Sequence, residues 1–126
     1  MLPKAVTEYL LAHRDRHLAE LCELLAIPSM ATVPDGACAA AAEWLRARLE
    51  RLGLGAQGVF SAGSALRSAT QSTSPPNVLA EAHVGEDRPT LLVYGHYDVQ
   101  PPDPLEAWET PPFNPQVRGG CLFAKD

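Results

Sequence analysis

The stretch that decides the fold is LLVYGHYDVQPP, which occupies residues 91–102. Residues 91–93 are continuously apolar, as is typical of a strand that is covered on both faces of a sheet. A glycine follows, and after it His96 and Asp98 stand two positions apart. We therefore predict an α/β fold in which a buried strand leads into a pair of polar side chains.

Two helices are predicted upstream of this stretch. The spacing of apolar residues predicts a first helix over residues 4–26, which Pro28 ends because the residue before a proline avoids helical angles. A second helix is predicted over residues 37–52, with Asp35 as its N-cap and Gly53 just past its end.

Short apolar runs between these helices and the central stretch predict strands over residues 56–60, 77–82 and 90–94. The link between the last two is short and turn-like, so we expect them to pair as a hairpin. Residues 61–76 are rich in Ser, Thr, Ala and Pro, and this composition predicts a loop.

Prolines and glycines organise the last part of the chain. Residues 100–115 hold six of the twelve prolines and predict a long structured loop. Two glycines then join residues 115–118 to residues 121–124, which predicts a second hairpin. The chain stops at Asp126 directly after a strand, and we expect this end to be a cut, because a sheet of this class needs cover on both faces.

His96 and Asp98 carry the candidate chemistry. Ligands of open α/β sheets bind beyond the carboxyl ends of strands, where both residues would lie. Side chains two apart in extended backbone point to the same side, so the two can converge. A neutral imidazole is a good zinc ligand, and a carboxylate beside it can accept its other N–H and fix its tautomer. A plain polar turn after a strand is the alternative, since an H-x-D triplet also occurs by chance.

The run LLVYGHYDVQPPDPLEAWETPPFNPQVRGG, residues 91–120, closely resembles the metal-site segment of a known family. That family comprises the zinc-dependent aminoacylases, carboxypeptidase G and carnosine-type dipeptidases, which are two-metal metallohydrolases. RDRHLAELCELLAIPS, residues 14–29, and AAEWLRARLERLG, residues 41–53, resemble its first two helices. The resemblance implies that residues 1–126 are the N-terminal part of a mixed-sheet, two-metal exopeptidase-like catalytic domain, and that this part is incomplete.

The resemblance also implies site roles. His96 would bind one zinc ion of the pair, and Asp98 would be the catalytic-site residue that holds the imidazole. Trp108 and the turn at residues 111–113 would shape the loop near the site. The bridging Asp, the other ligands and the general-base Glu fall later in the family pattern, and Asp126 is not the bridging Asp in this register. We therefore expect the isolated 126-residue chain to be inactive and to bind zinc weakly or not at all.

The expected function is hydrolysis of an amide bond in a peptide or N-acyl amino acid by a metal-activated water, as in a dipeptidase or carboxypeptidase. A homodimer is expected of the complete enzyme. Two alternatives stay open: a non-catalytic remnant or binding module without a complete metal site, and an unrelated α/β binding domain.

Composition argues against several other classes. The net charge is −5, and only 10 Lys and Arg residues are present without a basic run, which disfavours nucleic acid. No apolar run reaches the ~18 residues of a membrane span. The first residues resemble no signal peptide, and three cysteines make no closed disulfide framework. We therefore expect a cytoplasmic protein.

Two other motifs are set aside. Residues 53–58 match G-x-G-x-x-G, but the pattern follows a helix, whereas a dinucleotide site follows a strand and opens a helix. His13 and His17 share a helix face, yet the intervening residues lack the Glu of H-E-x-x-H, so we expect a surface face.

Overall fold

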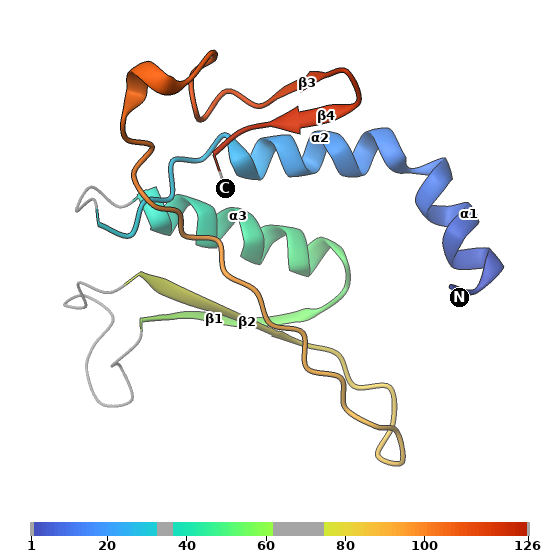
Figure 1. Ribbon diagram of the computed structural model, residues 1–126. Helices are drawn as coiled ribbons and strands as arrows, with labels where there is room; N and C mark the ends of the chain where they lie inside the picture. The colour runs from blue at the N-terminus through green and yellow to red at the C-terminus, as the bar shows by residue number, and fades with distance from the viewer. Residues whose placement is uncertain (1, 33–36, 62–74, 126) are drawn as a thin grey trace.

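The computed structural model describes residues 2–32, 37–61 and 75–125 (Figure 1). Helices cover one side of a small antiparallel sheet, and a second hairpin lies near the C-terminus of the described chain. The elements are α1 (Lys4–Ala12), α2 (Arg14–Leu25), α3 (Ala37–Arg51), β1 (Gly55–Ser61), β2 (Pro76–Glu81), the 3-10 helix η1 (Leu105–Ala107), β3 (Gln116–Arg118) and β4 (Cys121–Phe123).

The predicted single helix over residues 4–26 is wrong, because the chain breaks at His13. This residue has φ −116° and ψ 14°, and it separates α1 from α2. Its backbone N–H donates to the Tyr9 carbonyl, and its ring Nδ1 donates to the same oxygen at 2.8 Å. A side chain that competes for a helix carbonyl offers the backbone another conformation, which accounts for the break.

Helix α3 agrees with the prediction to within a residue and carries the buried core. Cys38, Ala41 and Ala42 are the buried hydrophobic residues in the part of the chain that the structure describes, and both alanines are fully inaccessible. Small side chains on this face let α3 lie directly on β1 and β2. The helix is followed by Gly53 at φ +78°, a left-handed conformation that glycine adopts without strain.

Polar side chains join α2 to α3 on the other side of that helix. Arg48 on α3 is paired with Glu20 on α2, and the indole N–H of Trp44 donates to Glu23 at 3.3 Å. Helix α3 is therefore held between α2 and the β1–β2 sheet (Figure 1).

Strand β2 pairs with β1, so the predicted hairpin of residues 77–82 with residues 90–94 is wrong. The pairing is antiparallel, with Gly55 opposite Glu81 and Ser61 opposite Pro76. A register shift between Gln57 and Val59 interrupts the ladder. Strand β2 therefore pairs with β1, which precedes it in the chain, whereas the short link after β2 had predicted pairing with residues 90–94, which follow it.

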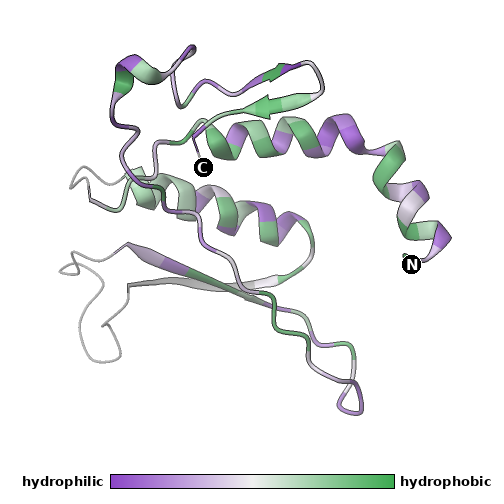
Figure 2. Cartoon of the chain, viewed as in Figure 1, coloured by the Kyte–Doolittle hydropathy of each residue, from purple (hydrophilic) through white to green (hydrophobic). Residues whose placement is uncertain are grey.

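The prediction that residues 91–94 form a buried strand is also wrong for this chain. Leu91, Leu92, Val93 and Tyr94 are 84%, 84%, 82% and 87% exposed, and no ladder partner faces them among the described residues. An apolar run predicts burial only where another part of the chain reaches it. Figure 2 shows this segment as a largely hydrophobic stretch that extends away from the helices.

The long loop over residues 100–115 is confirmed as structured. The Trp108 indole N–H donates to the Pro102 carbonyl at 2.9 Å. The hairpin that follows is also confirmed: β3 pairs with β4, and Gly119 and Gly120 turn the chain with φ +57° and +82°. Asp35 and most of the predicted loop 61–76 lie outside the described residues.

Candidate metal centre

The segment that carries His96 and Asp98 is fixed by the loop after α2. The Ser29 hydroxyl donates to the Tyr97 carbonyl at 2.6 Å, and the Val99 N–H donates to the Ser29 carbonyl at 3.0 Å. Met30 forms an isolated parallel bridge with Val99. Extended backbone therefore continues through the segment, although the residues before it have no ladder partner in the described chain.

His96 and Asp98 lie together, as their spacing predicted. The His96 Nδ1 atom is 3.2 Å from the Asp98 backbone oxygen and 3.5 Å from its carboxylate Oδ1. Both oxygens only accept hydrogen bonds, so Nδ1 carries the proton in the neutral ring and Nε2 carries the lone pair. The His96 side chain is 74% exposed. The arrangement thus presents Nε2 as a free ligand atom at the molecular surface.

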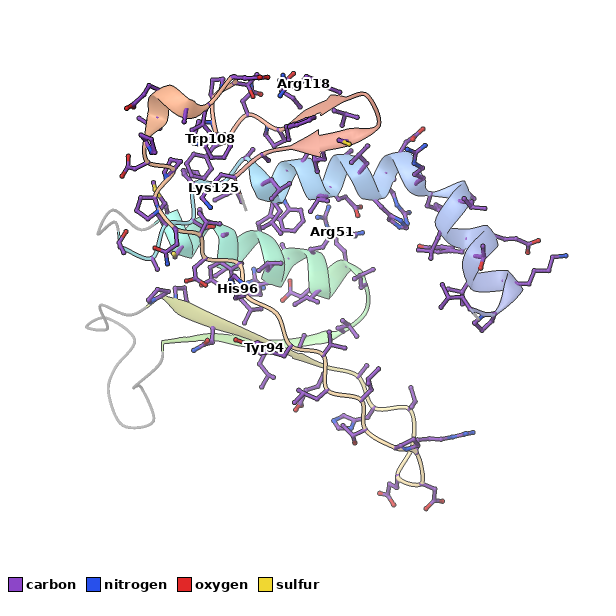
Figure 3. All side chains as sticks on the ribbon, in the orientation of Figure 1. Arg51, Tyr94, His96, Trp108, Arg118 and Lys125 are labelled. Carbon is purple, nitrogen blue, oxygen red and sulfur yellow. The ribbon has the colours of Figure 1, made fainter. Side chains whose placement is uncertain are left out.

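The hydrogen bond of Nδ1 goes to the main chain of Asp98, whereas the sequence predicted the carboxylate as acceptor. The carboxylate is close enough to act electrostatically on the ring, and a cation at Nε2 would strengthen that attraction. Figure 3 shows Tyr94 and His96 following one another along the extended segment.

Tyr97 anchors the same segment from between these two residues. Its hydroxyl donates to the Pro76 carbonyl at the start of β2. Burial raises the pKa of Tyr97 to about 12, with smaller contributions from Cys38 and Asp98. The hydroxyl therefore stays protonated and keeps its donor role at neutral pH.

Cys38 lies behind the site in the first turn of α3. Its thiol donates to the Ser29 carbonyl at 3.3 Å, and burial followed by the charge of Asp98 raises its pKa. A thiol with a raised pKa is a poor metal ligand and nucleophile, so Cys38 serves as packing and as a weak donor. Sequence reasoning missed Ser29 and Cys38; Pro28-Ser29, which ends the first helical region, was the available signal.

Several known proteins resemble this chain. It is 36% identical over 104 residues to succinyl-diaminopimelate desuccinylase of Xylella fastidiosa (strain 9a5c), covering 82% of this chain and 23% of that protein. It is 49% identical over 41 residues to the desuccinylase of Stenotrophomonas maltophilia (strain R551-3), covering 32% of this chain and 11% of that protein. These likenesses support the resemblance of the chain to the aminoacylase and dipeptidase family of hydrolases.

The fold agrees with this family. A solved structure of the di-peptidase Dug1p from Saccharomyces cerevisiae superposes with a TM-score of 0.74 at 22% identity, covering 88% of this chain and 24% of that one. The α/β fold class predicted from sequence is therefore confirmed, because the chain superposes on part of the di-peptidase structure. No family model matches the chain. The chain spans about a quarter of the length of the relatives it matches.

A family metal fits one position of this surface. His96 offers an exposed imidazole, and zinc binds the nitrogen atoms of histidine side chains. Across the described residues, no group of three or more His, Cys, Asp or Glu side chains is arranged to hold a metal ion. Zinc sites in proteins use three or four protein ligands. His96 is therefore one candidate ligand, and the described residues do not complete a metal site.

The remaining histidines are engaged elsewhere. The rings of His13 and His17 stack near Tyr9 with centroids 6.2 Å apart, and Arg16 lies 3.3 Å from His17 Nε2. These contacts agree with the predicted surface face. His83 is exposed and lies 3.9 Å from Glu81.

None of the helices described is long and apolar enough to cross a bilayer.

Proposed function

We propose that this chain provides one metal ligand to the catalytic domain of an amide-bond hydrolase that uses two divalent metal ions, with zinc as the expected metal. His96 holds one ion through Nε2, and Asp98 orients the ring. The observation that carries the proposal is the hydrogen bond of Nδ1 to the Asp98 backbone oxygen, with the carboxylate 3.5 Å away, since it favours the neutral tautomer that has its lone pair on Nε2. We propose further that residues 1–126 belong to a single catalytic domain.

The bound metal would supply the polarisation of the scissile carbonyl and the acidification of a water molecule. The chain itself keeps the imidazole in one tautomer and holds the segment at residues 97 and 99. The carboxylate of Asp98, 3.5 Å from Nδ1, would interact favourably with a ring that binds a cation. Trp108 keeps the following loop in one conformation through its bond to Pro102, consistent with a loop that borders the site.

The substrate class we propose is an N-acyl amino acid or a short peptide. Its support is the name of the desuccinylase relatives together with the dipeptidase whose fold this chain shares. We place the reaction in the cytoplasm, because Cys22, Cys38 and Cys121 are all free thiols, which is usual in a reducing compartment.

The experiment compares His96→Ala with His83→Ala in the protein at the full length that its gene encodes. His83 is a matched control, because it is also an exposed imidazole beside a carboxylate. Hydrolysis of N-succinyl amino acids and dipeptides is assayed with added zinc, and bound zinc is measured by elemental analysis. We expect His96→Ala to lose activity and zinc by at least ~100-fold and His83→Ala to keep both.

Wild-type activity in His96→Ala would remove the ligand assignment. Zinc binding by the wild-type protein without hydrolysis of any amide substrate would favour a binding module. In that protein Asp98→Ala is expected to weaken zinc binding by ~10–100-fold, as losses of groups that orient a metal ligand do.

A further inference from the structure

Ser29 is the buried polar side chain of the described chain, with only 3% exposure. A hydroxyl at that depth needs hydrogen-bond partners. Its Oγ donates to the Tyr97 carbonyl at 2.6 Å, and its own carbonyl accepts the Val99 N–H at 3.0 Å and the Cys38 thiol at 3.3 Å. One residue therefore holds the backbone immediately before and immediately after Asp98.

These two hydrogen bonds of Ser29 are important because the residues that precede His96 do not fix the backbone around Asp98. Residues 91–94 are exposed and have no ladder partner within the described chain, so they do not fix the orientation of the peptides that follow. The backbone oxygen that accepts the His96 Nδ1 proton and the carboxylate that lies 3.5 Å from Nδ1 both belong to Asp98. A rotation of the backbone at Asp98 would remove them and let the imidazole adopt its other tautomer.

We propose that Ser29 is a positioning residue for the candidate metal centre, which holds the backbone around Asp98 so that the Nε2 atom of His96 keeps its lone pair. The inference rests on the proposed function, in which His96 is a metal ligand. Ser29 touches neither the ring nor a substrate and acts through Tyr97 and Val99.

Two other contacts would keep the segment around Asp98 in place if the Ser29 hydroxyl were removed. The Met30–Val99 bridge and the bond from Tyr97 to Pro76 hold the segment in place without the Ser29 hydroxyl. Removing that hydroxyl should therefore release the orientation of Asp98 without detaching the loop.

The test uses the metal-free chain and Ser29→Ala. Long-range ¹H–¹⁵N NMR spectra, recorded where imidazole is neutral, report the tautomer of His96 directly. In the wild-type chain we expect the Nδ1–H tautomer, and in Ser29→Ala a shift of the tautomer ratio by roughly fivefold toward Nε2–H. Ser29→Thr keeps the hydroxyl and should restore the wild-type ratio.

Cys38→Ala is the matched control, because it removes another buried donor to Ser29 without touching Tyr97. Amide exchange in α3 monitors the fold of each variant. A Ser29→Ala chain with intact α3 and an unchanged His96 tautomer would overturn the proposal, as would an equal shift in Cys38→Ala.

The proposed function is tested separately by adding zinc. A shift of the His96 tautomer in Ser29→Ala upholds the positioning role even if zinc fails to reach His96. Loss of zinc binding in His96→Ala with no effect of Ser29→Ala on the tautomer would uphold the ligand and reject the positioning residue.

Discussion

The guanidinium of Arg48 on α3 is ion-paired with the carboxylate of Glu20 on α2, and the two side chains are only 19% and 22% exposed to solvent. Arg16 also approaches Glu20 at 4.0 Å. Glu20→Gln therefore leaves two cations without their partner in a partly desolvated position. We expect the free energy of unfolding to fall by about 1–2 kcal/mol, between the values for exposed and buried pairs.

Urea denaturation measures this change, and Glu8→Gln is the control. Glu8 pairs with Lys4 at 3.6 Å, and both side chains are well exposed, so its replacement should cost less than ~0.5 kcal/mol. Equal losses in the two variants would show that the α2–α3 pair adds nothing beyond a surface interaction.

Ala41→Leu should destabilise the fold, because Ala41 on α3 is fully buried. Added methylene groups in such a contact cost about 1–3 kcal/mol. Ala40→Leu, on the exposed side of the same helix, should stay within ~0.5 kcal/mol of the wild type. Thermal unfolding followed by circular dichroism checks both variants, and equal melting temperatures would mean that α3 is not packed as described.

The raised pKa of Tyr97 predicts that the stability of the fold depends on pH in the alkaline range. Its folded pKa of about 12 lies above the value of about 10 in an unfolded chain. The stability linked to this difference is fully present below about pH 10 and is lost as the pH rises through about 12. Urea midpoints between those values should therefore fall in the wild type and fall less in Tyr97→Phe.

The matched control for this titration is Tyr94→Phe, since Tyr94 is 87% exposed. It should keep the alkaline decline of the wild type. An identical decline in Tyr97→Phe would show that the Tyr97 hydroxyl does not gain protection on folding.

The cysteines should differ in reactivity. Cys38 is 7% exposed and its pKa is raised by burial and by Asp98, whereas Cys121 is exposed. Because the thiolate is the attacking form, iodoacetamide should modify Cys121 first and Cys38 only slowly. Mass spectrometry of the folded chain measures the order, and unfolding in urea should equalise the rates. Equal rates in the folded chain would contradict the placement of Cys38.

The elements that sequence predicted well are those that depend on neighbouring residues. The apolar spacing before Gly53 defined α3, and the glycine pair defined the β3–β4 hairpin. The break at His13 was missed, because it arises from a side-chain bond to Tyr9 that competes with the helix. The pairing of β2 was assigned to the wrong strand, because strand partners depend on the path of the whole chain.

The same distinction applies to the site. His96 and Asp98 are two residues apart, so their approach follows from local geometry and could be predicted. Ser29 lies 68 residues before Tyr97, and no pattern around either residue indicates that they meet. The candidate ligand His96 could therefore be found in the sequence, whereas the proposed positioning residue Ser29 could be found only from the fold.

Residues 91–94 have a further consequence for anyone who handles this protein. Adjacent apolar side chains on extended backbone without ladder partners in the described chain are the features of a fibril-forming segment. We therefore expect concentrated solutions to aggregate by edge-to-edge strand pairing at residues 91–94, unless another polypeptide covers them or a charged residue interrupts the run.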